Sequence, residues 1–154
     1  MKIRQIVFPL IIACVLISCN RQSPKSNDLI VQAPSQDPEL EKAKQDALLN
    51  FDSFIKSYNT HSNDLNYYYY LKTDFIDDGE HEHMWILVNK IENERFEGTL
   101  DNEPITVKNV KFGDLIKITK DQIEDWIIVD TETDKQEGGY SLKVFRNREN
   151  KNTH

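Results

Sequence analysis

The hydrophobic period of this sequence changes from a helical repeat to an alternating one near residue 60. Between residues 37 and 59, apolar side chains recur at steps of three and four: Leu40, Ala43, Ala47, Phe51, Phe54 and Tyr58. That spacing gathers them on one face of an amphipathic helix. Asp37 suits the cap of such a helix, and Pro38 suits its first turn. We therefore predict one helix over residues 37–59, followed by a polar loop at 60–66.

From residue 67 onward the chain is typical of short strands separated by turns. In 67–76 the odd positions Tyr67, Tyr69, Leu71 and Phe75 could form the buried face. Tyr68 and Tyr70 should then point outward, either as a contact patch or as residues that simply favour strands. Further strands are predicted at 84–88, 95–100, 105–110, 115–118, 126–130 and 139–145, with a short helical turn or loop at 120–125 and a solvated tail from residue 146. Short antiparallel strands indicate a curved sheet or a small barrel. One N-terminal helix packed on it gives an α+β fold.

Charge and cysteine content limit the classes of partner and site. The 154 residues include 26 acidic and 19 basic side chains, and removal of residues 1–18 would leave a formal net charge of −9. Because phosphate contacts require Lys and Arg, we expect no binding of nucleic acid or anionic lipid headgroups through the domain; charge alone favours a basic partner. Both cysteines, Cys14 and Cys19, lie near the N-terminus. The folded domain should therefore have neither a disulfide nor a thiolate metal site.

The N-terminus has the features of a bacterial lipoprotein signal peptide. Lys2 and Arg4 precede an apolar run over residues 6–17, which is too short to span a bilayer. The run ends in Leu-Ile-Ser-Cys19, which resembles the lipobox, where a thiol follows a small residue and takes the diacylglyceryl group. Cys14 also fits that pattern, but its apolar run would be shorter than is usual.

These features predict the order of segments along the chain. A signal peptide occupies residues 1–18, and lipid-modified Cys19 begins a flexible tether over 19–36 that is rich in Ser, Asn, Gln and Pro. One domain follows at 37–149, with a tail at 150–154. The protein should be an exported, palmitate-bearing lipoprotein attached to the cell membrane through Cys19. The absence of Asp after that cysteine favours the periplasmic side of the outer membrane.

Several short motifs appear in a fixed order between residues 75 and 140. They are Glu82-His83-Met84-Trp85, Gly98-x-Leu-x-Asn102-x-Pro104, Gly113-Asp114, Ile-x-Asp125-Trp126 and Gly138-Gly139-Tyr140. In identity and order they resemble a bacterial family called domain of unknown function 2314. That resemblance implies one compact domain, often exported, and it carries over no catalytic residue. His81 is not part of the family pattern.

The run at residues 77–83 contains two histidines that are two positions apart. On a strand, His81 and His83 would share one face, where two imidazoles could bind zinc or copper. Carboxylates would have to supply the remaining ligands, because the only other histidines are His61 and His154. The alternative is an acidic loop in which His83 closes a strand through hydrogen bonds. The sequence therefore predicts no cofactor, with His81 and His83 as the candidate metal ligands.

A second interpretation of this region is catalytic. Glu82 and His83 could act as an acid and a base, with Asp125 orienting the imidazole. The sequence has no recognisable nucleophile elbow, phosphate-binding glycine loop or His-Glu-x-x-His motif. Our main hypothesis is therefore a binding or interaction module of the cell envelope with a protein partner, for example an immunity-type inhibitor. The alternative hypothesis is a hydrolase or metal-dependent enzyme that uses Glu82, His83 and Asp125.

Overall fold

The computed structural model describes residues 37–152, and the predicted signal peptide, Cys19 and tether lie outside them. The elements in chain order are α1 (Pro38–Leu49), α2 (Phe51–His61), β1 (Tyr67–Asp77), β2 (Glu80–Glu92), β3 (Arg95–Leu100), β4 (Leu115–Thr119), a 3-10 turn η1 (Lys120–Gln122), β5 (Ile123–Asp130), β6 (Lys135–Gly138) and α3 (Tyr140–Asn152). The predicted strands at 67–76, 95–100, 115–118 and 126–130 are therefore confirmed. The strand predicted at 84–88 is the centre of the longer β2.

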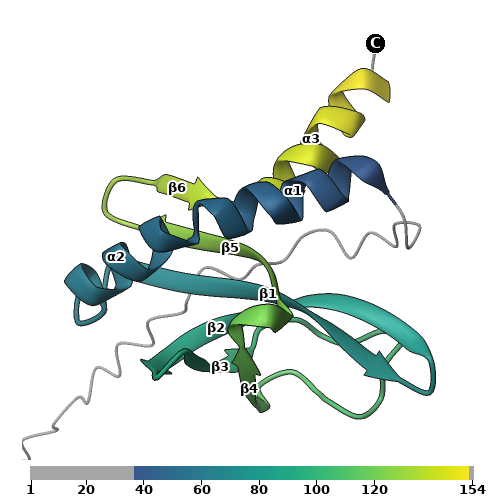
Figure 1. The fold of residues 1–154 in the computed structure, drawn as a ribbon, viewed down its shortest axis with the longest axis horizontal. Helices are drawn as coiled ribbons and strands as arrows, with labels where there is room; N and C mark the ends of the chain where they lie inside the picture. The colour runs from purple at the N-terminus through teal and green to yellow at the C-terminus, as the bar shows by residue number, and fades with distance from the viewer. Residues whose placement is uncertain (1–36, 153–154) are drawn as a thin grey trace, which may run out of the picture.

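The six strands form one antiparallel sheet in the order β4-β3-β2-β1-β5-β6. Helices α1 and α2 lie across one face of this twisted sheet, while α3 packs against α1 at one end (Figure 1). The predicted α+β class and the curved antiparallel sheet are thus confirmed. The alternative of a small barrel is wrong, because among the described strands β4 and β6 are the two edges and do not pair with each other.

Two consecutive helices take the place of the single helix predicted at the N-terminus. Asp37 caps α1 by accepting hydrogen bonds from the N–H groups of Glu39 and Leu40, at 3.0 and 3.3 Å. Asn50 interrupts the helix with φ −102° and ψ 9°, and its side-chain amide donates to the carbonyl of Asp46 at 2.8 Å. The apolar stripe continues through the break, so both helices bury the same face.

The larger core lies between α1–α2 and the facing side of the sheet. It contains Ala47, Phe51, Phe54, Tyr69, Leu71, Met84, Ile86, Val88, Phe96, Leu100, Val107, Ile118, Ile123, Trp126 and Ile128. A smaller cluster on the opposite side joins Tyr70, Trp85 and Ile127, with Leu142 of α3 packed against it. Tyr70 is only 3% exposed. The prediction that it points into solvent is therefore wrong, while Tyr68 is half-buried.

The strand predicted at 139–145 is wrong, because this segment is the first part of α3. Gly138 and Gly139 adopt φ values of +82° and +64°, which turn the chain away from β6. A Cβ atom at Gly138 would lie 2.1 Å from the carbonyl oxygen of Trp126, so no side chain fits there. The helix continues to Asn152 through most of the predicted tail.

The strand predicted at 105–110 is also wrong, because residues 101–114 form a loop beside β2 and β3. Positive φ at Gly113 (+86°) turns the chain into β4, as a turn at this position requires.

No helix within residues 37–152 combines the length and the apolar character needed to cross a membrane.

Candidate functional site

Glu82 and His83 are neighbours on β2 but lie on opposite faces of the sheet. Glu82 shares the face of Met84 and Ile86, which pack into the larger core, and is 4% exposed. His83 lies directly opposite Asp74 on β1, on the other face. The proposed acid–base pair therefore does not assemble, because successive side chains of a strand point in opposite directions.

The carboxylate of Glu82 binds the backbone of the 101–114 loop. It accepts hydrogen bonds from three consecutive N–H groups, those of Ile105, Thr106 and Val107, at 2.9 to 3.2 Å. Burial alone would raise the pKa of Glu82, but these amide bonds outweigh it and hold the pKa below its usual value. The buried carboxylate thus supplies acceptors that a neighbouring strand would otherwise provide, which explains why this segment is a loop.

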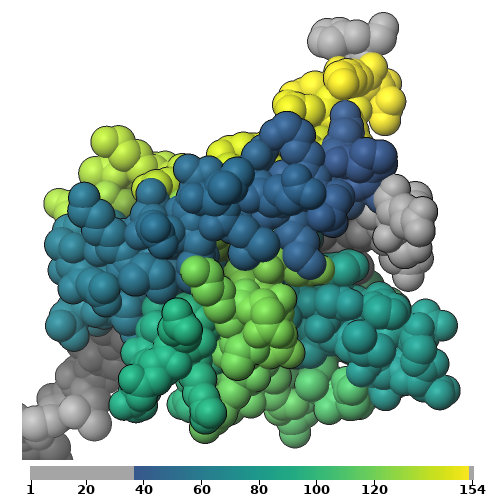
Figure 2. Space-filling view, viewed as in Figure 1, coloured from purple at the N-terminus to yellow at the C-terminus, as the bar shows by residue number. Residues whose placement is uncertain are grey.

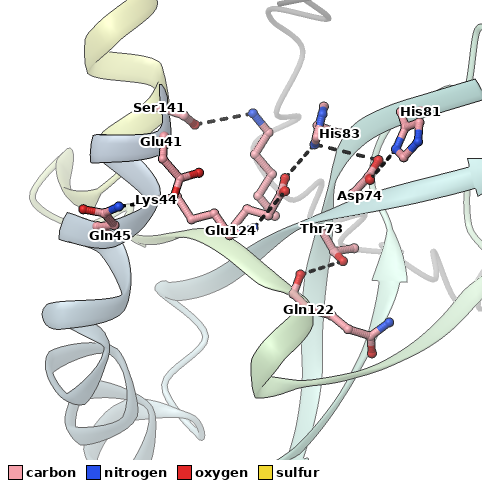
Figure 3. Close-up of polar contacts among 11 residues, drawn as sticks. Glu41, Lys44, Gln45, Thr73, Asp74, His81, His83, Gln122, Glu124 and Ser141 are labelled. Atoms are coloured by element: carbon pink, nitrogen blue, oxygen red, sulfur yellow. Dashed lines mark hydrogen bonds and ion pairs between the residues drawn. The ribbon is translucent and has the colours of Figure 1, made fainter. Parts of the chain in front are cut away.

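His81 and His83 share a face, and each imidazole is held by a carboxylate (Figure 3). His81 Nδ1 lies 2.6 Å from Asp74 Oδ2, and His83 Nδ1 lies 2.6 Å from Glu124 Oε2. Asp74 Oδ1 is buried, and it lies 3.9 Å from His83 Nδ1. Lys44 Nζ of α1 lies 3.4 Å from Glu124 Oε1. With Nδ1 donating to a carboxylate, Nε2 is the nitrogen that each imidazole presents for other contacts.

The hydrogen bond to Glu124 raises the pKa of His83, and the charge of Asp74 acts in the same direction. Burial would raise the pKa of Glu124, but the hydrogen bond to His83 and the positive charges of His83, Lys44 and Lys72 together outweigh it and hold the pKa below its usual value. Both shifts favour the charged forms of the two side chains. His83 is therefore ion-paired with Glu124 over the pH range in which its imidazole is protonated.

Asp125 serves α3 and does not orient His83. It is fully buried, and it accepts hydrogen bonds from the N–H groups of Trp126, Tyr140 and Ser141 and from the Ser141 hydroxyl, at 2.7 to 3.1 Å. Two of these donors belong to the first turn of α3, where helix N–H groups have no partner within the helix. Burial raises the pKa of Asp125, and the hydrogen bonds oppose that shift. The predicted pairing of Asp125 with His83 is therefore wrong.

Lys72 is a buried cation beside this cluster, with 9% of its surface exposed. Its Nζ lies 3.4 Å from Ser141 Oγ and 5.8 Å from the ring centroids of Trp85 and Phe145. Burial lowers the pKa of Lys72, while the negative charges of Asp125 and Glu124 oppose the shift. The ammonium group therefore lies between two aromatic side chains and two carboxylates, at the junction of β1 and α3.

The described residues contain no group of three or more His, Cys, Asp or Glu side chains arranged to hold a metal ion. Metal binding through His81 and His83 alone stays a prediction. Two hollows on the surface lie away from Glu82, His83 and Asp125. One of about 300 Å³ runs between α1 and α3, and one of about 590 Å³ lies beside the β2–β3 turn and β4.

Most of the motif residues found in the sequence make contacts that hold the scaffold together. Asn102 Oδ1 accepts from the N–H of Trp85 at 2.6 Å, and Trp126 Nε1 donates to the carbonyl of Ala47 at 2.8 Å. A Cβ atom at Gly98 would lie 2.5 Å from the carbonyl oxygen of Leu87 on the next strand. Asp114 accepts from the N–H of Lys111 at 3.0 Å and closes the turn next to Gly113.

The sequence matches a family described as "Uncharacterized protein conserved in bacteria (DUF2314)" over residues 37–154. The chain belongs to this family. It is also 31% identical over 116 residues to "Uncharacterized protein YegJ" of Escherichia coli (strain K12), covering 75% of this chain and 72% of that protein. No solved structure matches the sequence. The resemblance drawn from the motifs is therefore confirmed.

The sequence analysis did not identify the carboxylates that hold the two histidines, nor the buried Lys72. Lys72 and Asp74 are charged residues at even positions of a strand whose odd positions are mostly apolar, which was a usable signal that the second face is polar. Glu124 gave no such signal. Its contact with His83 spans 41 residues of sequence and depends on how β5 pairs with β1.

Proposed function

We propose that this protein is a non-catalytic binding module, attached to the bacterial cell envelope by a lipid on Cys19. The supporting observation is the separation of the three polar groups that a catalytic centre would combine. Glu82 binds a loop on one face, His83 pairs with Glu124 on the other, and Asp125 caps a helix. Glu82 and Asp125 are buried, and their oxygens accept hydrogen bonds from structural donors. Neither carboxylate therefore has a free oxygen for proton transfer to a substrate.

The recognition surface that we propose is the histidine face, defined as Asp74, Ile76, His81 and His83. Ile76 lies directly opposite His81 and is 56% exposed, and the His81 and His83 side chains are 54% and 44% exposed. An exposed apolar side chain beside orientated polar groups is a combination found in protein interfaces. A folded protein partner fits this surface better than a small substrate, since neither of the two hollows described above is lined by its residues.

Charge favours a basic partner. Residues 37–139 carry 24 acidic and 11 basic side chains, a formal net charge of −13. A field of this sign accelerates encounters with a cationic protein and disfavours anionic ones. An immunity-type inhibitor that neutralises a basic toxin is one partner relationship with these properties.

A photo-reactive residue placed at Ile76 of the full-length protein tests the recognition surface in living cells. Leu65, which is 68% exposed in the turn before β1, is the matched control position. We expect one discrete adduct from position 76 and none from position 65. Adducts of equal yield at both positions would contradict a defined surface. A hydrolytic activity of the purified protein that disappears in both Glu82→Gln and His83→Gln would support the enzyme alternative instead.

Labelling with a radioactive fatty acid tests the anchor separately. We expect Cys19→Ala to abolish the label and Cys14→Ala to preserve it, since Cys19 is the residue that follows the full-length apolar run. Label lost in the Cys14 variant but retained in the Cys19 variant would reverse the assignment. Label retained in both would exclude lipidation of either thiol.

A further inference from the structure

Helix α3 has a charge opposite to that of the rest of the domain. Its 13 residues include four basic side chains and one acidic one, a formal net charge of +3, in contrast to −13 for residues 37–139. The expectation that the domain avoids anionic lipid headgroups was based on the overall charge of the protein, which conceals this separation. At physiological ionic strength, charges further apart than about 8 Å are largely screened, so a surface close to α3 interacts mainly with α3 and the part of α1 packed against it.

Three of the four cations of α3 occupy one side of the helix. At about 100° per residue, Arg146 and Lys151 project within roughly 80° of Lys143, and the buried Ser141 and Phe145 lie on the opposite side. Lys143, Arg146 and Lys151 are all exposed, and Lys143 Nζ lies 4.8 Å from the ring centroid of Tyr140. We call these three residues the basic face of α3.

The fourth cation of α3 fixes the helix to the beginning of the domain. Arg148 binds Asp37 through two nitrogens, at 2.7 and 2.8 Å, and Glu39 at 2.6 and 2.8 Å. Such forked bonds define both the position and the orientation of the guanidinium group. The basic face is therefore held beside residue 37, the point at which the chain from the N-terminus enters the fold.

The shape of the molecule leaves this region accessible to a flat surface. Helix α3 projects beyond the sheet at the end where α1 begins (Figures 1 and 2). A groove of about 300 Å³ between the two helices is lined by Lys42, Lys143, Arg148 and Lys151, together with polar and acidic residues. A planar anionic surface can thus approach the end of α3 without first meeting the acidic strands.

We propose that the basic face of α3 docks onto an anionic lipid surface and orientates the domain on the membrane that carries its anchor. This rests on the proposed lipidation of Cys19. Only 17 residues separate Cys19 from Asp37, so even a fully extended connection could not exceed about 65 Å, and the lipid keeps α3 close to headgroup phosphates. The lipid holds the chain at the membrane without fixing the orientation of the domain, which contact of a basic patch with anionic headgroups can set.

Vesicle sedimentation with the unlipidated chain from residue 20 to residue 154 tests the proposal. The vesicles contain equal parts of phosphatidylglycerol and phosphatidylcholine, or phosphatidylcholine alone. We expect binding to the anionic vesicles only, weakened by added salt. Lys143→Glu, Arg146→Glu and Lys151→Glu together should reduce the affinity on the order of 100-fold, about fivefold for each cation removed.

The matched control changes Lys56, Lys111 and Lys135 to Glu, which are exposed lysines on α2, the 101–114 loop and β6. This control has the same net charge as the α3 variant but keeps the basic face of α3. Its affinity for anionic vesicles should therefore fall less than tenfold. Thermal unfolding of both variants checks the fold. Absence of binding to anionic vesicles, equal losses in the two variants, or stronger binding to a single-stranded oligonucleotide than to vesicles would each overturn the proposal. Because no lipid is attached in this assay, its result is independent of whether Cys19 is modified.

Discussion

The two faces of the sheet use adjacent residues of β2 in contrasting ways. On the helix-covered side, Glu82 is buried and its oxygens are occupied by three amides of a loop. On the other side, His83 is 44% exposed and hydrogen-bonds to Glu124, with Asp74 at 3.9 Å. The comparison teaches that a charged group near a predicted site can be entirely structural when the strand directs it inward. Burial of the side chain, and not its proximity in sequence to a candidate site, distinguishes the structural role of Glu82 from the exposed position of His83.

The largest effect should come from Glu82→Ala. Its removal leaves three buried or partly buried backbone N–H groups without an acceptor, and we expect a loss of about 3 kcal/mol in the free energy of unfolding. Urea denaturation measures this. Glu80→Ala, at an exposed position of the same strand, is the control and should change stability by less than about 0.5 kcal/mol. A loss below about 1 kcal/mol for Glu82→Ala would contradict the structural role.

Asp125→Ala should be the next most damaging change, at about 2 kcal/mol. Asp125 belongs to the same side of the sheet as His83, yet it is buried and bonded to the first turn of α3. This variant therefore tests whether burial, rather than the side of the sheet, determines how much stability is lost when a carboxylate is removed. Hydrogen exchange should accelerate at the amides of Tyr140 and Ser141. Unchanged hydrogen exchange at these amides would contradict the role of Asp125 in α3. A loss of unfolding free energy no greater than that of Asp74→Ala would show that burial does not determine the effect.

The His83–Glu124 pair on the exposed side should contribute much less to the free energy of unfolding. A double-mutant cycle of His83→Ala and Glu124→Ala is expected to give a coupling of about 0.5 kcal/mol, because His83 is partly exposed and solvent screens the interaction. The same cycle with His83→Ala and Asp125→Ala should give a coupling near zero. A coupling to Asp125 larger than the coupling to Glu124 would reverse the assignment of the partner.

The smallest effect should be the pH dependence of that pair. The pKa of His83 is raised above 6.5, so its contribution is complete below pH 6.5 and is lost as pH rises through the folded-state pKa. The pKa of Glu124 is lowered below 4.5, so its contribution is present above pH 4.5 and is lost as pH falls through the folded-state pKa. The difference in stability between wild type and His83→Gln should therefore be greatest at about pH 4.5–6.5. A difference that grows above pH 8 would contradict this.

Much of the sheet could be predicted from local patterns, because period-two alternation and turn residues are local properties. The bounds predicted for β3 agree with the structure, and those for β1 differ by one residue. Helix α3 could not be predicted in this way. Tyr140, Leu142 and Val144 alternate as in a strand, whereas the contacts that select a helix come from Asp125 and from α1. Those contacts are formed only in the folded state.

The candidate site was only partly predictable for a related reason. That His81 and His83 share a face follows from strand geometry. The partner of His83 depends on a register shift in β5 between the partners of Lys72 and Thr73, which lies at Glu124. A bulge of this kind changes which of two adjacent acidic residues reaches the imidazole. Nothing in the local sequence around Glu124 and Asp125 indicates that shift.

The order of the strands has a consequence for how the chain reaches its native state. In the described sheet, every pair of neighbouring strands but one is also consecutive along the chain; the exception is β1 with β5. Strands β1 to β4 can therefore form by successive local hairpins, whereas β5 must join β1 across a long loop. Closing long loops is entropically unfavourable and slows folding. Late formation of the β1–β5 pairing would leave the inner edge of β1 exposed in partly folded chains, which is where we expect misfolding and self-association to begin.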